Sequence, residues 1–234
     1  MDTQGLYRFL SELSANNNRE WFAANKERWM ELRKGWMDDI DLLLSRMAEW
    51  DPAFRRLTAK DCVYRIYRDV RFSADKSPYK TWVCAGINVH GKSSHDGGYY
   101  VQAGPVSDGS YVSSGLYGGV WEPDSSTLKK LRRAIVDNIE EFREITETEE
   151  ISRIFPGWCG NKLKTMPQGW PKDHPDADLL RLKEYGKACY CDEAFFTGDW
   201  TGEASRRFRL LKPMVDFLNY SIEESTSSNM IWNV

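Results

Sequence analysis

The sequence is poor in the residues that build disulfide frameworks and metal centres. Its five cysteines are odd in number and irregularly spaced, so we expect buried thiols rather than disulfides. The three histidines do not fall at the i, i+4 spacing of helical metal ligands, and a zinc or iron centre needs three or four convergent ligands. Nucleophile elbows, phosphate-binding loops and dinucleotide fingerprints are absent. We therefore predict no metal and no cofactor, and the sequence names no catalytic residue.

Long apolar runs and an excess of one charge are missing too. No apolar run approaches the roughly 18–20 residues that a membrane-spanning helix requires. The N-terminal residues lack the basic start and apolar run of a signal peptide. We therefore expect a cytoplasmic protein with no membrane partner. The net charge is −3, with 32 basic and 35 acidic residues, which argues against nonspecific nucleic-acid binding. A local basic patch would still suit a phosphate.

Aromatic residues are abundant, with ten Trp, eleven Tyr and ten Phe. The hydrophobic fraction of 41% is typical of a globular protein, and no linker divides the chain, so we predict one α+β domain over residues 1–234. Residues 1–50 form a helical N-terminal segment, with helices over 3–15 and 19–49. The asparagines at 16–18 separate the two, because Asn is a favoured helix N-cap.

Residues 62–118 are predicted to form a central, mainly antiparallel sheet, joined by a strand near 187–191. Its strands are expected at 63–72, 81–89, 98–106 and 110–117, with a turn at Asp108-Gly109 and a glycine-rich stretch after the last strand. Short connections favour antiparallel neighbours. Apolar periodicity predicts helices at 126–145 and 201–224, the second kinked by Pro213, with shorter ones at 149–155 and 176–185. The Gly- and Pro-rich residues 156–172 should be extended and cover another part of the chain.

The most informative stretch is Tyr64–Lys80, YRIYRDVRFSADKSPYK. Residues 60–80 hold six basic and three acidic side chains in a chain that is net acidic. Alternation places Arg65, Tyr67, Asp69 and Arg71 on one face of the predicted strand, where Asp69 and Arg71 can meet. Arginine suits bidentate binding of phosphate or carboxylate, and tyrosine adds hydroxyls and stacking faces. The predicted ligand-binding residues are Arg65, Tyr67, Asp69, Arg71, Lys76, Tyr79, Lys80 and Tyr100.

Three functions and one structural role stay open. The preferred function is binding of a small anionic ligand that carries phosphate or carboxylate, in a pocket lined by Arg, Lys and Tyr, with or without catalysis. The alternatives are a nucleic-acid binder that uses the local basic and aromatic surface, and a protein-interaction module that docks through the Trp-rich helix or the Gly-rich stretch. In the structural role, the stretch is a ladder of salt bridges in which Arg68 pairs with Asp69, Asp75 or a helix glutamate.

Several motifs resemble those of a bacterial and fungal family, domain-of-unknown-function family 2461. They are NNNREWF, RIYRDVRFSADKSPYKT, GGYYVQAGP, GLYGGVWEPDSSTLKKLRRAI and DHPDADLLRLK, in the family's order along the chain. The resemblance implies a single α+β domain in a soluble protein and supplies no activity or cofactor. Residues 82–84 are bulkier, and the glycine-rich stretch at 115–121 longer, than the family's pattern. The residues that match its central motif are Arg65, Arg68, Asp69, Arg71, Asp75, Lys76, Pro78, Tyr79 and Lys80.

Overall fold

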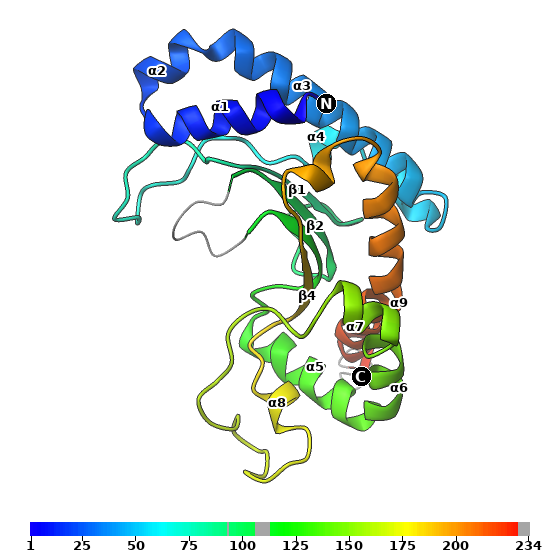
Figure 1. Cartoon of the computed structure of the whole chain (residues 1–234). Coiled ribbons are helices and arrows are strands. Elements are labelled where there is room, and N and C mark those ends of the chain that lie inside the picture. The colour runs from blue at the N-terminus through cyan, green and yellow to red at the C-terminus, as the bar shows by residue number, and fades with distance from the viewer. Residues whose placement is uncertain (93, 106–112, 229–234) are drawn as a thin grey trace. The chain divides into compact units, whose positions relative to one another are not determined.

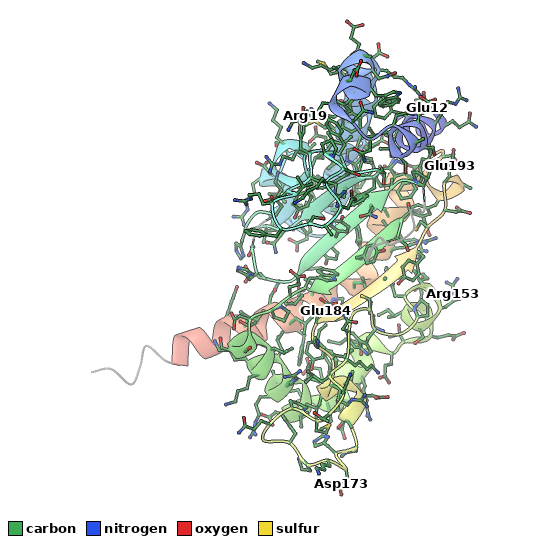
Figure 2. All side chains as sticks on the ribbon, turned by 90° about the vertical axis from the view of Figure 1, so that its left-hand side faces the viewer. Glu12, Arg19, Arg153, Asp173, Glu184 and Glu193 are labelled. Atoms are coloured by element: carbon green, nitrogen blue, oxygen red, sulfur yellow. The ribbon has the colours of Figure 1, made fainter. Side chains whose placement is uncertain are left out.

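A computed structural model of the chain describes residues 1–92, 94–105 and 113–228 (Figure 1). The chain divides into two compact units. The first consists of Met1–Lys92, Tyr100–Leu116 and Tyr190–Arg209, and the second of Ser93–Tyr99, Tyr117–Cys189 and Leu210–Val234. Charged side chains such as Arg19 in the first unit and Arg153 and Asp173 in the second are exposed (Figure 2). No described helix is long and apolar enough to cross a membrane.

One antiparallel sheet of four strands is built in the order β1-β2-β3-β4. The strands are β1 (Val83–Ile87), β2 (Gly98–Ala103), β3 (Gly115–Val120) and β4 (Tyr185–Tyr190). Nearly every strand residue is buried, on both faces of the sheet. The predicted fold class, a single α+β domain with a mainly antiparallel sheet, is confirmed.

Two of the strand predictions need correction. Residues 63–72 form no regular strand, and contribute only the isolated bridges Val63–Ala85 and Tyr67–Tyr79. Pro78 explains part of this, because its carbonyl accepts from the Arg68 N–H at 2.9 Å but it has no N–H to donate in return. The second correction concerns the glycine-rich stretch, whose residues 115–120 are strand β3 itself rather than a segment after the sheet. The predicted turn at Asp108-Gly109 lies outside the described residues.

The helices of the first unit are α1 (Thr3–Ala15), α2 (Arg19–Ala24), α3 (Lys26–Met47) and α4 (Ala59–Cys62), with 3-10 turns at Pro52–Arg56 and Ala194–Phe196. Helix α1 packs beside α3 (Figure 1). Asn18 caps α2 as predicted, its Oδ1 accepting from the Trp21 N–H at 2.9 Å. The single helix expected over 19–49 is instead broken at Asn25, whose Nδ2 donates to the Trp21 carbonyl at 2.9 Å.

The second unit holds α5 (Ser125–Asp137), α6 (Ile139–Thr146), α7 (Glu149–Ile154) and α8 (Ala177–Leu180). The helix expected over 126–145 breaks at Asn138, whose Nδ2 donates to the Ala134 carbonyl at 3.0 Å, the same competition seen at Asn25. The helix expected over 176–185 is only the four residues of α8. Helix α9 (Trp200–Ser228) belongs to both units and contains Pro213.

Each unit has its own aromatic core. In the first, Trp36 of α3 is fully buried and stacks on Trp200 with ring centroids 5.6 Å apart. In the second, Phe142 of α6 is fully buried against Trp158, at 5.6 Å, and Tyr185 of β4, at 6.4 Å. Aromatic rings bury 150–250 Å² each, so these clusters account for much of the apolar burial in each unit.

Candidate functional site

The stretch Tyr64–Lys80, the 64–80 hairpin, folds back on itself beside strand β1 in the first unit. The Lys80 N–H donates to the Ile66 carbonyl at 2.7 Å, and the Tyr64 N–H donates to the Cys84 carbonyl at 3.1 Å. Because backbone hydrogen bonds are few, side-chain contacts hold the rest of the hairpin in shape. Its shape therefore depends on how the charged residues of the motif are paired.

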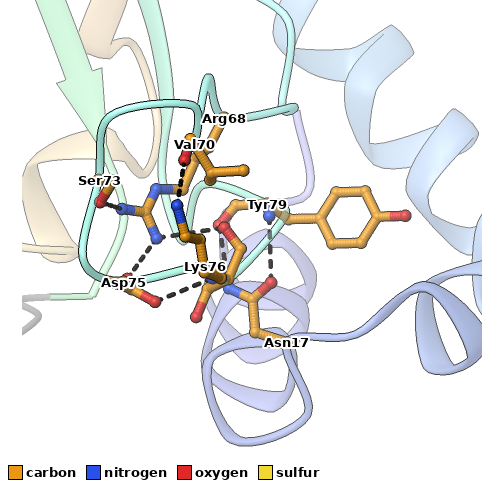
Figure 3. Close-up of polar contacts among 8 residues, drawn as sticks. Asn17, Arg68, Val70, Ser73, Asp75, Lys76 and Tyr79 are labelled. Carbon is orange, nitrogen blue, oxygen red and sulfur yellow. Dashed lines mark hydrogen bonds and ion pairs between the residues drawn. The ribbon is translucent and has the colours of Figure 1, made fainter.

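Asn17 fastens the returning arm of the hairpin to the turn between α1 and α2. Its Oδ1 accepts from the Tyr79 N–H at 3.1 Å, and its Nδ2 donates to the Tyr79 carbonyl at 2.9 Å (Figure 3). The Tyr79 ring stacks on Phe22 of α2, with centroids 4.1 Å apart and planes 15° apart. The two sequence motifs NNNREWF and DKSPYK thus meet in one contact. Asn17 was missing from the sequence-based site, although its neighbour Asn18 was recognised as a cap.

Arg68 holds the loop of the hairpin from inside (Figure 3). Its guanidinium pairs with Asp75 and donates to the Ser77 carbonyl at 3.2 Å. The Arg68 side chain is 23% exposed and that of Asp75 60%, so the arginine is partly covered while its carboxylate partner faces water. Hydrogen bonds from Ser77 and the ion pair with Arg68 hold the pKa of Asp75 well below its usual range. Lys76 completes the loop by donating from Nζ to the Val70 carbonyl at 3.0 Å.

A second group of charged side chains in the hairpin is exposed to water, and in it two arginines act on one carboxylate. Arg71 binds Asp69 as a fork, with Nε to Oδ1 at 3.0 Å and Nη2 to Oδ2 at 2.6 Å. Hydrogen bonds from Arg71 lower the pKa of Asp69 to about 2, and the charge of Arg65 contributes. The exposed Arg65 makes no hydrogen bond or ion pair with any residue that the structure describes. We call Arg65, Tyr67, Asp69 and Arg71 the open face.

Two aromatic rings border the open face. Tyr67 is 52% exposed and lies 5.4 Å from Tyr79 and 6.2 Å from Phe22, measured between ring centroids. Phe72 is 96% exposed, with the Arg71 guanidinium 5.9 Å from its ring centroid. Rings held at the edge of a cationic surface can stack on a flat ligand or on another guanidinium.

The structure does not bring all eight predicted residues together. Lys76 belongs to the loop and the buried Tyr79 to the contact with α2. Lys80 lies on the other side, its Nζ 5.2 Å from the centroid of the Tyr64 ring. Tyr100 is beside the same ring at 6.4 Å, and its hydroxyl donates to Gln102 at 2.8 Å. Arg65, Tyr67, Asp69 and Arg71 are all exposed, and the charges of Arg65 and Arg71 both act on the carboxylate of Asp69.

The hollows of the first unit lie at another place. One of about 730 Å³ is lined by α1 residues including Tyr7 and Arg8, and one of about 630 Å³ by residues including Tyr190 and Arg207; both reach Ser114. The Tyr7 and Ser114 hydroxyls, which both line the first of these hollows, are hydrogen-bonded at 3.1 Å. A ligand on the open face would therefore bind to an exposed surface rather than inside these hollows.

Cysteines and potential metal ligands add no second centre in the described part of the chain. None of the five cysteines forms a disulfide with another described residue. Burial raises the pKa of Cys62 to about 12 and that of Cys159 to about 11, so both are thiols rather than thiolates near neutral pH. Among the described residues, no group of three or more His, Cys, Asp or Glu side chains is arranged to hold a metal ion.

Comparison with known proteins gives one match. A family model described as "Conserved hypothetical protein (DUF2461)" matches residues 5–217, which is most of the chain and includes the whole 64–80 hairpin and Asn17. No curated protein and no solved structure matched.

Proposed function

This chain belongs to the DUF2461 family of conserved hypothetical proteins, and we propose that it binds a small anionic molecule on the open face of the 64–80 hairpin. The ligand carries a phosphate or carboxylate group. The proposal narrows the eight residues expected from the sequence to Arg65, Tyr67, Asp69 and Arg71. Lys76 and Tyr79 act instead by holding the hairpin in shape.

The observation that carries the proposal is the unequal pairing of charges in the hairpin. Arg68, which is 23% exposed, and Asp75 form an ion pair with each other. On the open face two guanidiniums, Arg65 and Arg71, face the single carboxylate of Asp69. The open face therefore keeps a net positive charge without a counter-ion from the described residues. A phosphate or carboxylate there would bridge the two arginines, which suit bidentate anion binding.

The ligand competes with the ion pair between Arg71 and Asp69, which is weak because it is open to water. The Arg71 and Asp69 side chains are 76% and 50% exposed, and ion pairs at such exposure contribute little to stability. An incoming anion can therefore bind Arg65 and the free edge of Arg71 without unfolding the hairpin. The half-exposed Tyr67 ring would stack on an attached flat group, which favours a nucleotide or another aromatic phosphate ester.

The protonation state of Asp69 favours binding over catalysis. With a pKa of about 2, its carboxylate is too weak a base to take a proton efficiently near neutral pH. Asp69 would instead orient Arg71. The five cysteines form no disulfide among the described residues, which supports a reducing compartment, so a cytoplasmic location is part of the proposal.

The test measures thermal unfolding of the protein with inorganic phosphate and with adenosine 5′-monophosphate. We expect both probes to raise the melting temperature of the wild type, and the nucleotide to act at lower concentration. Arg71→Ala and Arg65→Ala should lose this stabilisation while the ligand-free melting temperature stays nearly unchanged. Arg133→Ala is the matched control, because Arg133 pairs with Asp137 at similar exposures of 74% and 52%.

Loss of the probe effect in Arg133→Ala would show that the probes do not act through the hairpin alone and would contradict the proposal. So would probe stabilisation that persists in both hairpin variants. If Arg71→Ala unfolds without ligand, the fork is structural and the salt-bridge ladder considered from the sequence is the better account.

Phe72 favours a second candidate function, binding of single-stranded nucleic acid. An almost fully exposed ring beside Arg71 is a stacking surface that any base can use, and Arg65 would contact the backbone. The test is a gel shift with single- and double-stranded oligonucleotides at two salt concentrations, using Phe72→Ala as the variant. Absence of a shift at low salt would reject this function.

A further inference from the structure

Lys187 of strand β4 is a buried cation in the second unit, outside the hairpin. Only 4% of its surface is exposed, and its neighbours Gly186 and Ala188 are buried as well. Lysine is almost never fully buried unless its ammonium is paired. The burial of the Lys187 ammonium therefore needs a chemical explanation.

The ammonium of Lys187 has weak partners. Nζ lies 3.4 Å from the Gly157 carbonyl, a long hydrogen bond, and 4.7 Å from the centroid of the Trp158 ring. No carboxylate of the described residues forms an ion pair with it. Removing an ammonium from water without a counter-ion costs several kcal/mol, on the order of a large fraction of a domain's stability. The neutral amine avoids most of that cost.

The direction of the pKa shift of Lys187 agrees with a buried amine that has weak partners. Burial lowers the pKa of Lys187, while Glu147 and Cys159 act in the opposite direction. The pKa of Cys159 is itself raised to about 11, mainly by burial, so near neutral pH it is a thiol without charge. A desolvated lysine with a lowered pKa is the form that attacks carbonyl groups in enzymes.

The cover over Lys187 belongs to the glycine- and proline-rich stretch, which the sequence predicted to cover another part of the chain. Gly157 and Gly160 have φ angles of +71° and +89°, and enclose Trp158 and Cys159 between them. Glycine adopts such angles without strain, so the loop can turn at both positions. Gly157 is exposed and Trp158 partly so, which means that one layer of a surface loop separates the amine from water.

The Trp158 ring that covers the amine belongs to an aromatic cluster. Trp158 stacks on Phe142 with planes 8° apart and meets Tyr185 edge-on at 6.0 Å. Tyr185 and Lys187 are two residues apart on β4 and so lie on the same face of the strand. A molecule that displaced Trp158 would find an amine beside apolar rings.

We propose that Lys187 is a nucleophilic lysine that forms an imine with a small aldehyde or ketone carrying an apolar or aromatic body. The lone pair of the neutral Nζ attacks the carbonyl carbon, and the carbonyl π electrons move to oxygen. Transfer of one proton from nitrogen to that oxygen gives a carbinolamine. The carbinolamine then loses water, its hydroxyl leaving with a second proton from nitrogen, and the C=N bond forms. No oxidant or reductant takes part.

The test uses benzaldehyde with sodium cyanoborohydride, which reduces an imine to a stable benzylamine. The folded protein is treated briefly near pH 7.5, digested, and the modified lysines are quantified by mass spectrometry. We expect Lys187 to carry more adduct than the exposed Lys183, because a lowered pKa leaves a larger fraction of the amine neutral. Trp158→Ala, which removes the cover, should raise the labelling of Lys187 further.

Lys187→Met, which keeps the length and burial of the side chain, serves as the matched control. It should remove the adduct without changing the labelling of Lys183. Labelling of Lys187 equal to or below that of Lys183 would overturn the proposal and make Lys187 a structural residue. So would a Trp158→Ala protein that stays folded by circular dichroism but labels Lys187 no faster than the wild type.

Discussion

The side-chain amide of Asn17 pairs with both backbone groups of Tyr79, accepting from the N–H at 3.1 Å and donating to the carbonyl at 2.9 Å. The two residues are 62 positions apart, and an amide is the side chain that can satisfy a backbone donor and acceptor at once. This contact joins the helical N-terminal segment to the 64–80 hairpin, and so places the open face beside α2.

Loss of the Asn17 amide should destabilise the protein. We expect Asn17→Ala to lower the free energy of unfolding by about 1–3 kcal/mol, because it leaves a partly buried backbone donor and acceptor unpaired. Asn17→Asp should also be harmful, since a carboxylate faces the Tyr79 carbonyl in place of an amide N–H. Urea unfolding measures both. Asn16→Ala is the control, because the Asn16 amide bonds only to the Glu12 carbonyl at an exposed position; an equal effect of both variants would contradict the prediction.

The two arginines that pair with aspartates in the hairpin should differ in their effect on stability. Arg68→Ala removes contacts to Asp75 and the Ser77 carbonyl at a side chain that is 23% exposed, and should cost about 1–3 kcal/mol. Arg71→Ala should leave the ligand-free stability unchanged, because its ion pair is open to water. Denaturant unfolding of the two proteins without ligand provides the comparison. A larger loss of stability in Arg71→Ala than in Arg68→Ala would contradict the prediction and show that Arg71, on the open face, is the structural arginine.

Lowering the pH should reduce the contribution of Glu203 to the stability of the folded protein. Hydrogen bonds from Arg206, together with those from Arg207, lower the pKa of Glu203 from 4.5 to about 2. A lowered pKa in the folded state stabilises the protein above pH 4.5, and this stabilisation disappears as the pH falls through 4.5 to about 2. Urea unfolding should therefore show Glu203→Gln less stable than the wild type at pH 6, with the difference shrinking over that range. A stability difference independent of pH would show that the arginines do not stabilise the ionised carboxylate of Glu203.

Gly119 of β3 should not tolerate a side chain. Its φ is +143°, and a Cβ there would lie 2.1 Å from the Tyr185 carbonyl oxygen of β4. Backbone strain and overpacking together should make Gly119→Ala cost about 3 kcal/mol or more. Gly91→Ala separates backbone strain from overpacking, because Gly91 has a φ of +96° but nothing lies within 4 Å of its added Cβ. Thermal unfolding of both variants tests this, and equal losses would mean that the contact between the strands relaxes.

Most helical segments were predicted correctly from the sequence, except for the breaks at two asparagines and the helix expected over 176–185, of which only α8 forms. Apolar periodicity is a local signal, so α1, α7 and most of α9 agree with the prediction. Breaks at Asn25 and Asn138 were missed because the same residue type is tolerated inside helices when its amide faces water. In both cases the amide instead takes the carbonyl four residues earlier.

Strand predictions were less accurate, because alternation does not reveal which segment supplies the hydrogen bonds. Residues 63–72 alternate clearly but find only isolated bridges, while the glycine-rich residues 115–120 form a complete strand between two others. Close approach between β3 and β4 at Gly119 needs a residue without a side chain. A glycine-rich sequence therefore marked a tightly packed strand rather than a loop.

The sequence by itself determined the α+β class, the family, and the meeting of Asp69 with Arg71, since all three depend on composition, motif order and neighbours two residues apart. Only the tertiary structure decided which charges serve the fold and which stay accessible. Arg68 turns inward to Asp75, Tyr79 is held by Asn17, and Lys187 lies beneath Trp158. The physical reason is that burial and pairing depend on residues distant in the chain, and these two quantities set the charge, reactivity and stability of each group.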